Sequence, residues 1–331
     1  MAGHLNVSVA ERNIQFVRRF ITLVLEQGLV EFCDELLHPD VKFIDPSMPP
    51  DVPDGGEGIR LAVHAIHQHF NGYSLRLDDI FSVGEGTVVN RFTGHALHKG
   101  GFFGSAAVNK PVTWTGKTIY RFKDGLIHRI WLQWDLLGTL IQLGVVQTRT
   151  ANTPPPWVVP PVPGTPYLVT DRKAVPRAAS NHAGVQANLA TVRRMFAGIT
   201  EEPLESLVKG CLAPTYARTD NCALAEAPND IAGFVRYIKV ARECFRGYRM
   251  QVDEIFGEGD KVVARVHASG LHTGGFLGVE RGGQNLDFTL TFIFRMEDGR
   301  IAHSFVTWNV YRALHQLGAL PPPPGSLTRS P

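Results

Sequence analysis

Asp135 ends a stretch of sequence that could carry acid/base chemistry. It follows Trp131 and Gln133 at alternate positions, so a β-strand over 127–135 would place the three side chains on one face. A free aspartic acid titrates at about pH 3.9, but burial beside an aromatic ring raises the pKa toward neutral pH. Such a carboxyl group can give and take protons there. The alternative is a structural role, in which Asp135 caps a helix over 136–143.

Several residues upstream of Asp135 are candidates for the same site. Arg91 could pair with Asp135, which alone would lower the pKa of the carboxyl group, or it could be an ordinary surface arginine. His95 and His98 flank a glycine-rich turn. His98 could transfer a proton or orient a carbonyl group, or it could support the fold. Asp135 and His98 are thus the candidate catalytic residues, and the others are candidates for substrate binding.

Aromatic side chains favour a flat, hydrophobic small-molecule substrate. Trp114, Tyr120 and Phe122 alternate along a predicted strand and share one of its faces. Such a face suits a polycyclic or polyene ligand, although core packing explains it equally well. The further candidates for substrate binding are Trp131, Gln133, Trp114, Tyr120 and Asp45, the last from the segment FIDP at 43–46.

The sequence shows no pattern of metal or redox ligands. His64, His67 and His69 crowd one predicted helix, but only the first two share a face, and no Asp, Glu or Cys lies nearby at ligand spacing. The cysteines at 33, 211, 222 and 244 form no CxxC pair and are expected to be reduced core residues. We therefore predict neither a metal nor another cofactor.

One long sequence unit occurs twice in the chain. HKGGFFG at 98–104 returns as HTGGFLG at 272–278, a shift of 174 residues, and upstream matches such as Asp45 with Asp220 are shifted by 175. A unit of this length can close its own core. The sequence thus predicts two duplicated domains, 1–148 and 185–331, joined by a stiff proline-rich linker at 149–184.

The second copy differs at the position of the candidate acid. WLQWDLLGTLIQLG at 131–144 corresponds to FVTWNVYRALHQLG at 305–318, which sets Asn309 against Asp135. An amide donates and accepts hydrogen bonds but cannot carry a proton. We therefore predict that the first domain is catalytic and that the second is not.

The order of predicted elements indicates the α+β class. Apolar residues at helical spacing predict an opening helix, and strand-like runs follow. Asp124-Gly125 between two such runs predicts a hairpin. Helices followed by a β-meander are typical of α+β domains. The expected helices are 13–27, 31–37, 59–70 and 136–143, and the expected strands are 41–44, 74–81, 87–97, 111–122 and 127–135.

Composition narrows the classes of protein and partner. The chain has 331 residues, 44% of them hydrophobic and 19% charged, as in ordinary globular proteins. The net charge of +2 comes from scattered residues, which gives nucleic acid no basic surface to bind. The N-terminal residues resemble no signal peptide, and no apolar run is long enough to span a bilayer. We expect a cytoplasmic protein with no membrane or nucleic-acid partner.

Together these residues resemble the SnoaL-like polyketide cyclases of the nuclear-transport-factor cone superfamily. The resemblance rests on Asn13 in the first helix, FIDP at 43–46, the run at 98–104, DGLI at 124–127 and W-x-x-x-D at 131–135 followed by QLG. It implies α+β cone domains, in which a curved, mostly antiparallel sheet wraps helices around an apolar pocket. It further implies that the two domains pack as a dimer-like pair within one chain, as a monomer or a homodimer of it; the alternative is two independent domains.

The resemblance also implies a reaction. In these cyclases the aspartate of the closing strand is the acid/base of an intramolecular aldol ring closure, and by motif position it is Asp135. The expected activity is cofactor-free ring closure in a polyketide-like molecule, by aldol, Michael or related addition. Such isomerase or lyase chemistry belongs to specialised metabolism, including antibiotic biosynthesis.

Two other functions remain open at this level. Limonene-epoxide-hydrolase-like relatives use an Arg-x-Asp on a strand, but here Thr93 stands two positions after Arg91. Epoxide opening would also need a second carboxylate, from Asp45 or Glu57. The remaining function is a non-catalytic ligand-binding or assembly module, because this fold hosts many such proteins.

Overall fold

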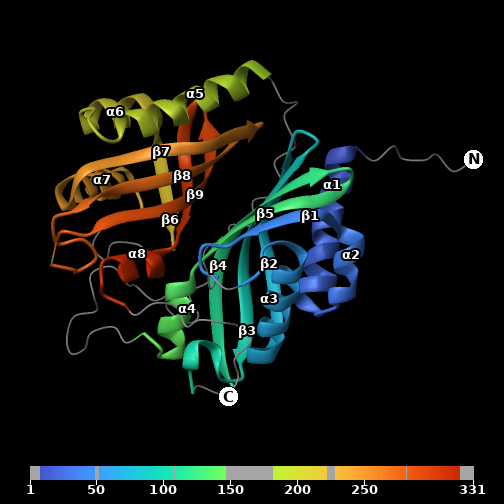
Figure 1. Ribbon diagram of the computed structural model, residues 1–331. Coiled ribbons are helices and arrows are strands. Elements are labelled where there is room, and N and C mark those ends of the chain that lie inside the picture. Colours follow the sequence, from blue (N-terminus) through green and yellow to red (C-terminus); the bar gives the residue numbers. More distant parts are fainter. Residues whose placement is uncertain are drawn as a thin grey trace, which may run out of the picture. The chain divides into compact units, whose positions relative to one another are not determined.

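The computed structural model describes residues 8–48, 52–106, 109–146, 182–221, 228–280 and 282–320. Of the predicted linker at 149–184, only the last three residues are described, and they begin a helix. The chain divides into two compact units, each built on a five-stranded sheet with helices (Figure 1). The predicted α+β class with two tandem domains is confirmed.

The sheet of the first domain has one parallel pair. Its strand order is β1-β5-β4-β3-β2, with β1 parallel to β5 and the other neighbours antiparallel. The elements are α1 (Val9–Arg19), η1 (Phe20–Glu26), η2 (Val30–Phe32), α2 (Cys33–Leu36), β1 (Leu37–Ile44), α3 (Gly55–His69), β2 (Phe70–Val83), β3 (Thr87–His98), η3 (Phe102–Gly104), β4 (Lys110–Lys123) and β5 (Leu126–Trp134). The helix α4 (Leu136–Leu143) follows, and the segment Asp135–Ile141 is grouped with the second compact unit.

The second domain repeats this plan. Its strand order is β6-β10-β9-β8-β7, with β6 parallel to β10 and the other neighbours antiparallel. The elements are α5 (His182–Gly198), α6 (Leu204–Cys211), β6 (Leu212–Asp220), α7 (Ile231–Cys244), β7 (Phe245–Glu258), β8 (Lys261–His272), β9 (Asn285–Glu297), β10 (Arg300–Trp308) and α8 (Val310–Gln316).

The first helix supplies the centre of the core in the first domain. It begins at Val9, four residues before the predicted start, because the Ser8 hydroxyl accepts a hydrogen bond from the Glu11 N–H at 3.2 Å and caps it. The helix continues as the π-helical segment η1. From this segment the Phe20 ring meets the Tyr120 ring edge-on at 6.3 Å. Helix and sheet thus close on each other through large apolar groups.

The turns follow the sequence signals, whereas the strand ends do not. Asp124 and Gly125 have φ values of 51° and 78° and join β4 to β5, so the predicted hairpin is confirmed. The strand expected from 74 instead starts at Phe70, immediately after α3. Strand β1 likewise starts at Leu37, four residues before the predicted start.

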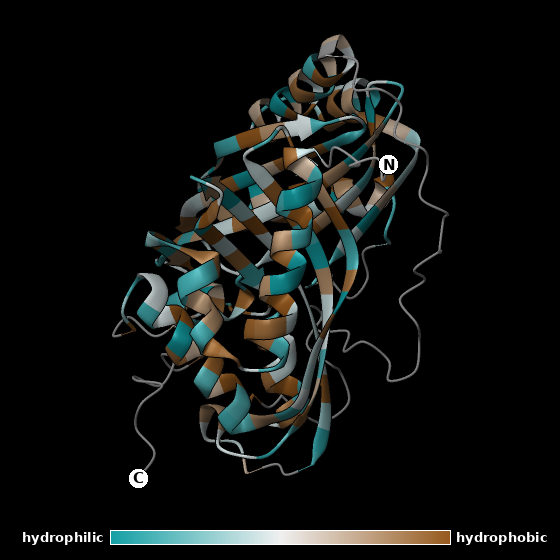
Figure 2. Cartoon of the chain, turned by 90° about the vertical axis from the view of Figure 1, so that its right-hand side faces the viewer, coloured by the Kyte–Doolittle hydropathy of each residue, from teal (hydrophilic) through white to brown (hydrophobic). Residues whose placement is uncertain are grey.

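Apolar residues are distributed as two half-buried sheets require. Hydrophobic and hydrophilic residues are interspersed along the strands and helices in Figure 2. Cys33 and Cys211 are buried, Cys244 is half-buried, and all three are free thiols, while Cys222 lies outside the described residues. Within the described ranges, no helix is both long and apolar enough to cross a membrane.

We expect Asn13→Ala to lower the free energy of unfolding by about 1–2 kcal/mol, the usual effect of leaving a buried polar group without its partner. Asn13 is buried, and its Nδ2 donates to the Glu85 carbonyl at 2.7 Å, which ties the first helix to the turn between β2 and β3. Urea unfolding measures the loss. Gln15→Ala, on the exposed side of the same helix, should change it by less than about 0.5 kcal/mol.

Candidate functional site

A cluster of aromatic rings occupies the helix-covered side of the first sheet. Trp114 on β4 lies with its ring centroid 5.4 Å from that of Tyr73, 6.2 Å from that of Phe70 and 6.4 Å from that of Trp134. Phe70, Trp114 and Trp134 all pack into the main hydrophobic core of this domain. Of the predicted aromatic residues, this cluster contains Trp114, which lies at its centre.

Other predicted substrate-binding residues lie on the opposite face of this sheet. Arg91, Lys117 and Gln133 are direct neighbours across β3, β4 and β5, so they share one face. That face alternates with the positions of Phe92 and Trp134, which pack into the core. The structure therefore separates Arg91 and Gln133 from the aromatic cluster.

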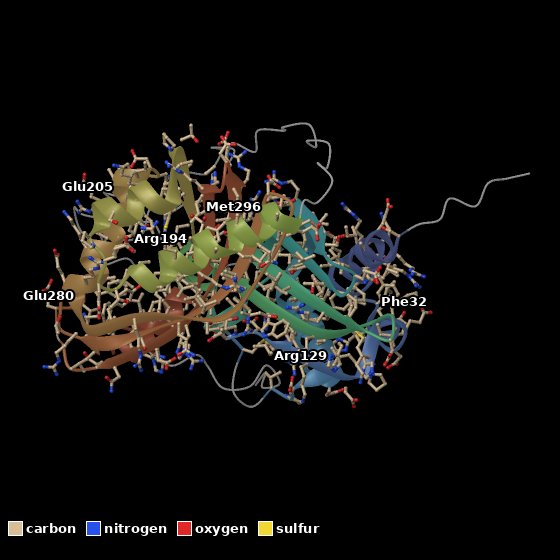
Figure 3. All side chains as sticks on the ribbon, turned by 90° about the horizontal axis from the view of Figure 1, so that it is seen from above. Phe32, Arg129, Arg194, Glu205, Glu280 and Met296 are labelled. Atoms are coloured by element: carbon tan, nitrogen blue, oxygen red, sulfur yellow. The ribbon has the colours of Figure 1, made fainter. Side chains whose placement is uncertain are left out.

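Trp131 and His95 lie on this same outer face. Trp131 pairs with Ile119, and the guanidinium carbon of Arg129, which is labelled in Figure 3, lies 5.7 Å from the Trp131 ring centroid. His95 is exposed, and its Nδ1 lies 3.2 Å from the Thr113 hydroxyl. The tryptophan of β5 that faces the interior is thus Trp134.

Asp45 is connected to the aromatic cluster by hydrogen bonds. Trp134 Nε1 donates to Asp45 Oδ2 at 3.2 Å and to the Ser47 hydroxyl oxygen at 2.8 Å. The Ser47 hydroxyl and N–H both donate to Asp45 Oδ1, at 2.6 and 2.8 Å. Burial raises the pKa of Asp45, and these hydrogen bonds only partly oppose it. Asp45 is therefore a carboxyl group beside the rings that protonates more readily than a free aspartic acid.

Asp135 follows β5 and caps α4. Its Oδ1 accepts a hydrogen bond from the Gly138 N–H at 3.0 Å, and its carbonyl accepts one from the Thr139 hydroxyl at 3.0 Å. Burial raises the pKa of Asp135 from 3.8 to about 6, against the lowering effect of the bond from Gly138. The helix cap foreseen as an alternative is present, and it coexists with a carboxyl group that titrates near neutral pH.

Arg91 forms an ion pair with Asp78, a residue that the sequence did not single out. Arg91 Nη1 lies 3.4 Å from Asp78 Oδ2, and the Thr93 hydroxyl donates to the same oxygen at 2.7 Å. The Asp78 side chain is only 2% exposed. It sits at a β-bulge, where the pairing of β2 with β3 skips from Leu77 to Asp79. A bulge redirects a side chain, so simple alternation could not place it.

The histidines have structural surroundings. His98 is 0% exposed and packs on Phe70 with ring centroids 5.4 Å apart, as His272 does on Phe245 at 5.5 Å. The same packing in both domains favours the fold-supporting role for His98. His67 Nε2 lies 3.0 Å from the Leu25 carbonyl. In the part of the chain that the structure describes, no three His, Cys, Asp or Glu side chains gather as a metal site would require.

Tyr120 lies deeper than a ligand-contacting residue. It is 2% exposed beneath Phe20, and burial raises its pKa to about 12, opposed by hydrogen bonds with Thr118 and Asn90. Of the two readings that the sequence left open for the alternating aromatic residues, core packing therefore describes Tyr120.

A cavity in the second domain marks the corresponding interior space. It measures about 80 Å³ and is lined by Tyr248, Phe288 and Trp308, among others. In the repeat these three occupy the positions of Tyr73, Trp114 and Trp134. The aromatic cluster of the first domain is thus at the position where its duplicate encloses a cavity.

We expect wild type to lose unfolding free energy relative to Asp135→Asn as the pH rises from about 4 to about 6. The pKa of Asp135 is higher in the folded chain than its ordinary value, so the folded state holds the proton more tightly and ionisation destabilises it. Urea unfolding at several pH values measures the difference, in which the common titration of Asp45 cancels. If the free energies of unfolding of the two proteins changed with pH in the same way, the raised pKa of Asp135 would be contradicted.

Comparison with protein families identifies the family of both repeats. The family model of the SnoaL-like polyketide cyclases matches residues 15–143 and 190–317, one match in each repeat and more than half of the chain in total. No curated protein sequence matches the chain.

Several solved structures are similar to part of the chain. TsrD from Streptomyces laurentii is 27% identical over 42% of this chain and 98% of its own, with a TM-score of 0.37. AclR from Streptomyces galilaeus is 24% identical over 42% and 90%, with a TM-score of 0.37. IdmH from Streptomyces antibioticus is 23% identical over 40% and 98%, with a TM-score of 0.35. With its family model matched in both repeats, the chain belongs to the SnoaL-like polyketide cyclase family.

Proposed function

We propose that the chain closes a ring in a polyketide-like molecule by acid/base catalysis, with Asp135 of the first repeat as the proton carrier. Membership of the cyclase family supports the reaction class. The observation that carries the choice of residue is a carboxyl group with a pKa of about 6 at the end of the closing strand. General acid/base catalysis is most efficient when the pKa of the group lies near the working pH.

Comparison of the two domains separates this role from helix capping. Asn309 Oδ1 accepts a hydrogen bond from the Arg312 N–H at 2.9 Å, just as Asp135 Oδ1 accepts one from Gly138 at 3.0 Å. The cap therefore needs a side-chain oxygen and not a carboxyl group. What a carboxyl group adds to an amide at this position is the ability to exchange a proton.

The proposed step needs no oxidant, reductant or second substrate. The ionised Asp135 takes the proton from a carbon between two carbonyl groups, and the enolate attacks a carbonyl carbon of the same molecule. A carbon–carbon bond forms while the electron pair of that C=O moves to its oxygen. The oxygen then receives the proton, so that product and substrate are isomers and the aspartate is ready again.

The aromatic cluster is the proposed binding surface for the rest of the substrate, because Trp134, the residue before Asp135, belongs to it, whereas Trp131 and Gln133 lie on the opposite face. Trp114, Tyr73 and Trp134 offer flat apolar groups for a conjugated ring system. Asp45, held by Trp134, provides an acceptor for a substrate hydroxyl group at its edge. Holding the two reacting carbons close together would supply much of the rate enhancement, since ring closure is unimolecular.

Asp135→Asn should reduce turnover by about 100-fold or more, the usual contribution of a general acid/base, while the fold is retained, as Asn309 already caps α8. The assay is ring closure of an aromatic polyketide with an acidic carbon between two carbonyl groups, followed by chromatography and mass spectrometry. Asp40→Asn, at an exposed carboxyl group, is the matched control and should keep wild-type turnover.

Undiminished turnover in Asp135→Asn would remove Asp135 from the mechanism. Incorporation of ¹⁸O from labelled water into the product would show hydrolysis in place of ring closure. Saturable binding without turnover in the wild-type chain would show a binding module.

Gly138→Ala should also lower turnover, by displacing the Asp135 carboxyl group without removing it. An added Cβ at Gly138 would lie 2.1 Å from Asp135 Oδ2, so the carboxyl group must rotate away. Turnover as a function of pH should show both a lower maximum and a shifted acidic limb. Gly86→Ala is the control, because a Cβ there meets nothing within 4 Å; equal activities of the two variants would argue against a fixed carboxyl position.

A further inference from the structure

The second domain, whose repeat has Asn309 in place of the candidate acid, encloses a cavity lined by apolar residues and two charged side chains. The cavity volume of about 80 Å³ is several times the roughly 10–15 Å³ that one water molecule needs on the same measure. Most of its lining is aromatic or aliphatic, including Phe234, Phe245, Tyr248, Phe276, Phe288 and Trp308. Such a space suits a compact ring system better than isolated water molecules.

An ion pair lies in the wall of this cavity. Arg218 and Asp220 on β6 both line it, and Arg218 Nη2 binds Asp220 Oδ2. Their side chains are only 10% and 1% exposed. The guanidinium carbon of Arg218 also lies 4.2 Å from the Tyr237 ring centroid. A partner carboxylate and an aromatic face together hold the arginine in one orientation.

Arg218 stays charged in this setting. Burial alone would lower its pKa, but the neighbouring Asp220 carboxylate outweighs burial and raises it. The pair is therefore neutral overall, and a neutral ligand can enter without a net charge being buried. Removing either member would leave a buried charge uncompensated.

One donor of this arginine has no acceptor. Among the residues that the structure describes, none accepts a hydrogen bond from Arg218 Nε, which is itself buried. Nη2 is engaged with Asp220. A buried charged donor without a partner is unfavourable. Because Arg218 lines the cavity, a ligand there with an acceptor oxygen could supply the missing partner.

The fold does not require polar residues at positions 218 and 304. Arg218 pairs with Ser304 across β6 and β10, and the corresponding pair across β1 and β5 is Phe43 with Ile130. The first domain thus builds the same strands, in the same register, with two apolar side chains. Arg218 and Ser304 are therefore specific to the second domain, whereas Asp220 has a counterpart in Asp45.

We propose that the second domain binds a flat, mainly apolar molecule through a carbonyl oxygen that accepts a hydrogen bond from Arg218 Nε. The apolar lining would bury the rings, and the Arg218–Asp220 pair would fix the position of the oxygen. The proposal concerns ligand binding and involves no proton transfer, so it can hold whether or not Asp135 is the proton carrier.

The test compares two probes that differ by one oxygen, 1-tetralone and tetralin, by isothermal titration calorimetry on the full chain. We expect 1-tetralone to bind at least about tenfold more tightly, the usual effect of one hydrogen bond to a charged donor. Hydrogen–deuterium exchange should show protection by 1-tetralone in peptides covering 212–220 and 231–244. Lack of 1-tetralone binding up to its solubility limit, or protection confined to 55–69 and 110–123, would overturn the proposal.

The decisive variant is the double substitution Arg218→Phe with Ser304→Ile, which installs the residues of the first domain at both positions. Asp220→Asn is added to it, because the buried carboxylate would otherwise lose its partner. The triple variant should fold, as judged by circular dichroism, and bind 1-tetralone no more tightly than tetralin. If it fails to fold, Arg218→Lys makes the same comparison, because lysine keeps the charge but lacks Nε. Arg246→Met, at an exposed arginine on β7, should retain the wild-type preference. A tenfold preference that persists in the folded Arg218 variants would contradict the assignment.

Discussion

The parallel pairing of the first strand of each domain with its closing strand determines where chemistry can occur. β1 lies against β5, and β6 against β10, although every other strand pair is antiparallel. Each pairing joins residues that are more than 80 positions apart in the chain. It sets Asp45 beside Trp134 and Arg218 opposite Ser304. Strand pairing thus brings polar groups together at the edge of an apolar interior. No local pattern in the sequence could predict this.

The same scaffold carries two different interiors. In the first domain the strand pair is apolar at Phe43 and Ile130, and the nearby carboxyl group of Asp45 is bound to a serine and a tryptophan. In the second domain the corresponding carboxyl group, Asp220, is bound to a buried arginine. Burial raises the pKa of Asp45, and its hydrogen bonds with Ser47 and Trp134 only partly oppose this. The two domains therefore share the same strand geometry, but the buried carboxyl group has different partners in each.

Features encoded by a repeat or by a local turn could be predicted from the sequence, whereas features set by the pairing of distant strands could not. The repeat at HKGGFFG, the α+β order and the hairpin at Asp124 were predictable because spacing and turn chemistry fix them. The face on which Trp131 and Gln133 lie was harder to predict, because the interior tryptophan at the end of β5 is Trp134. Asp78 was not predictable at all, since its position depends on a bulge in β2.

The cap at the start of α4 and α8 has a consequence for how the two halves can change. Because an amide oxygen and a carboxylate oxygen receive the same backbone N–H there, the exchange of Asp135 for asparagine or of Asn309 for aspartic acid leaves each helix intact. The cap therefore forms with either residue. A copy of this domain can gain or lose a titratable group at this position in a single step while the hydrogen bond that begins the helix is kept.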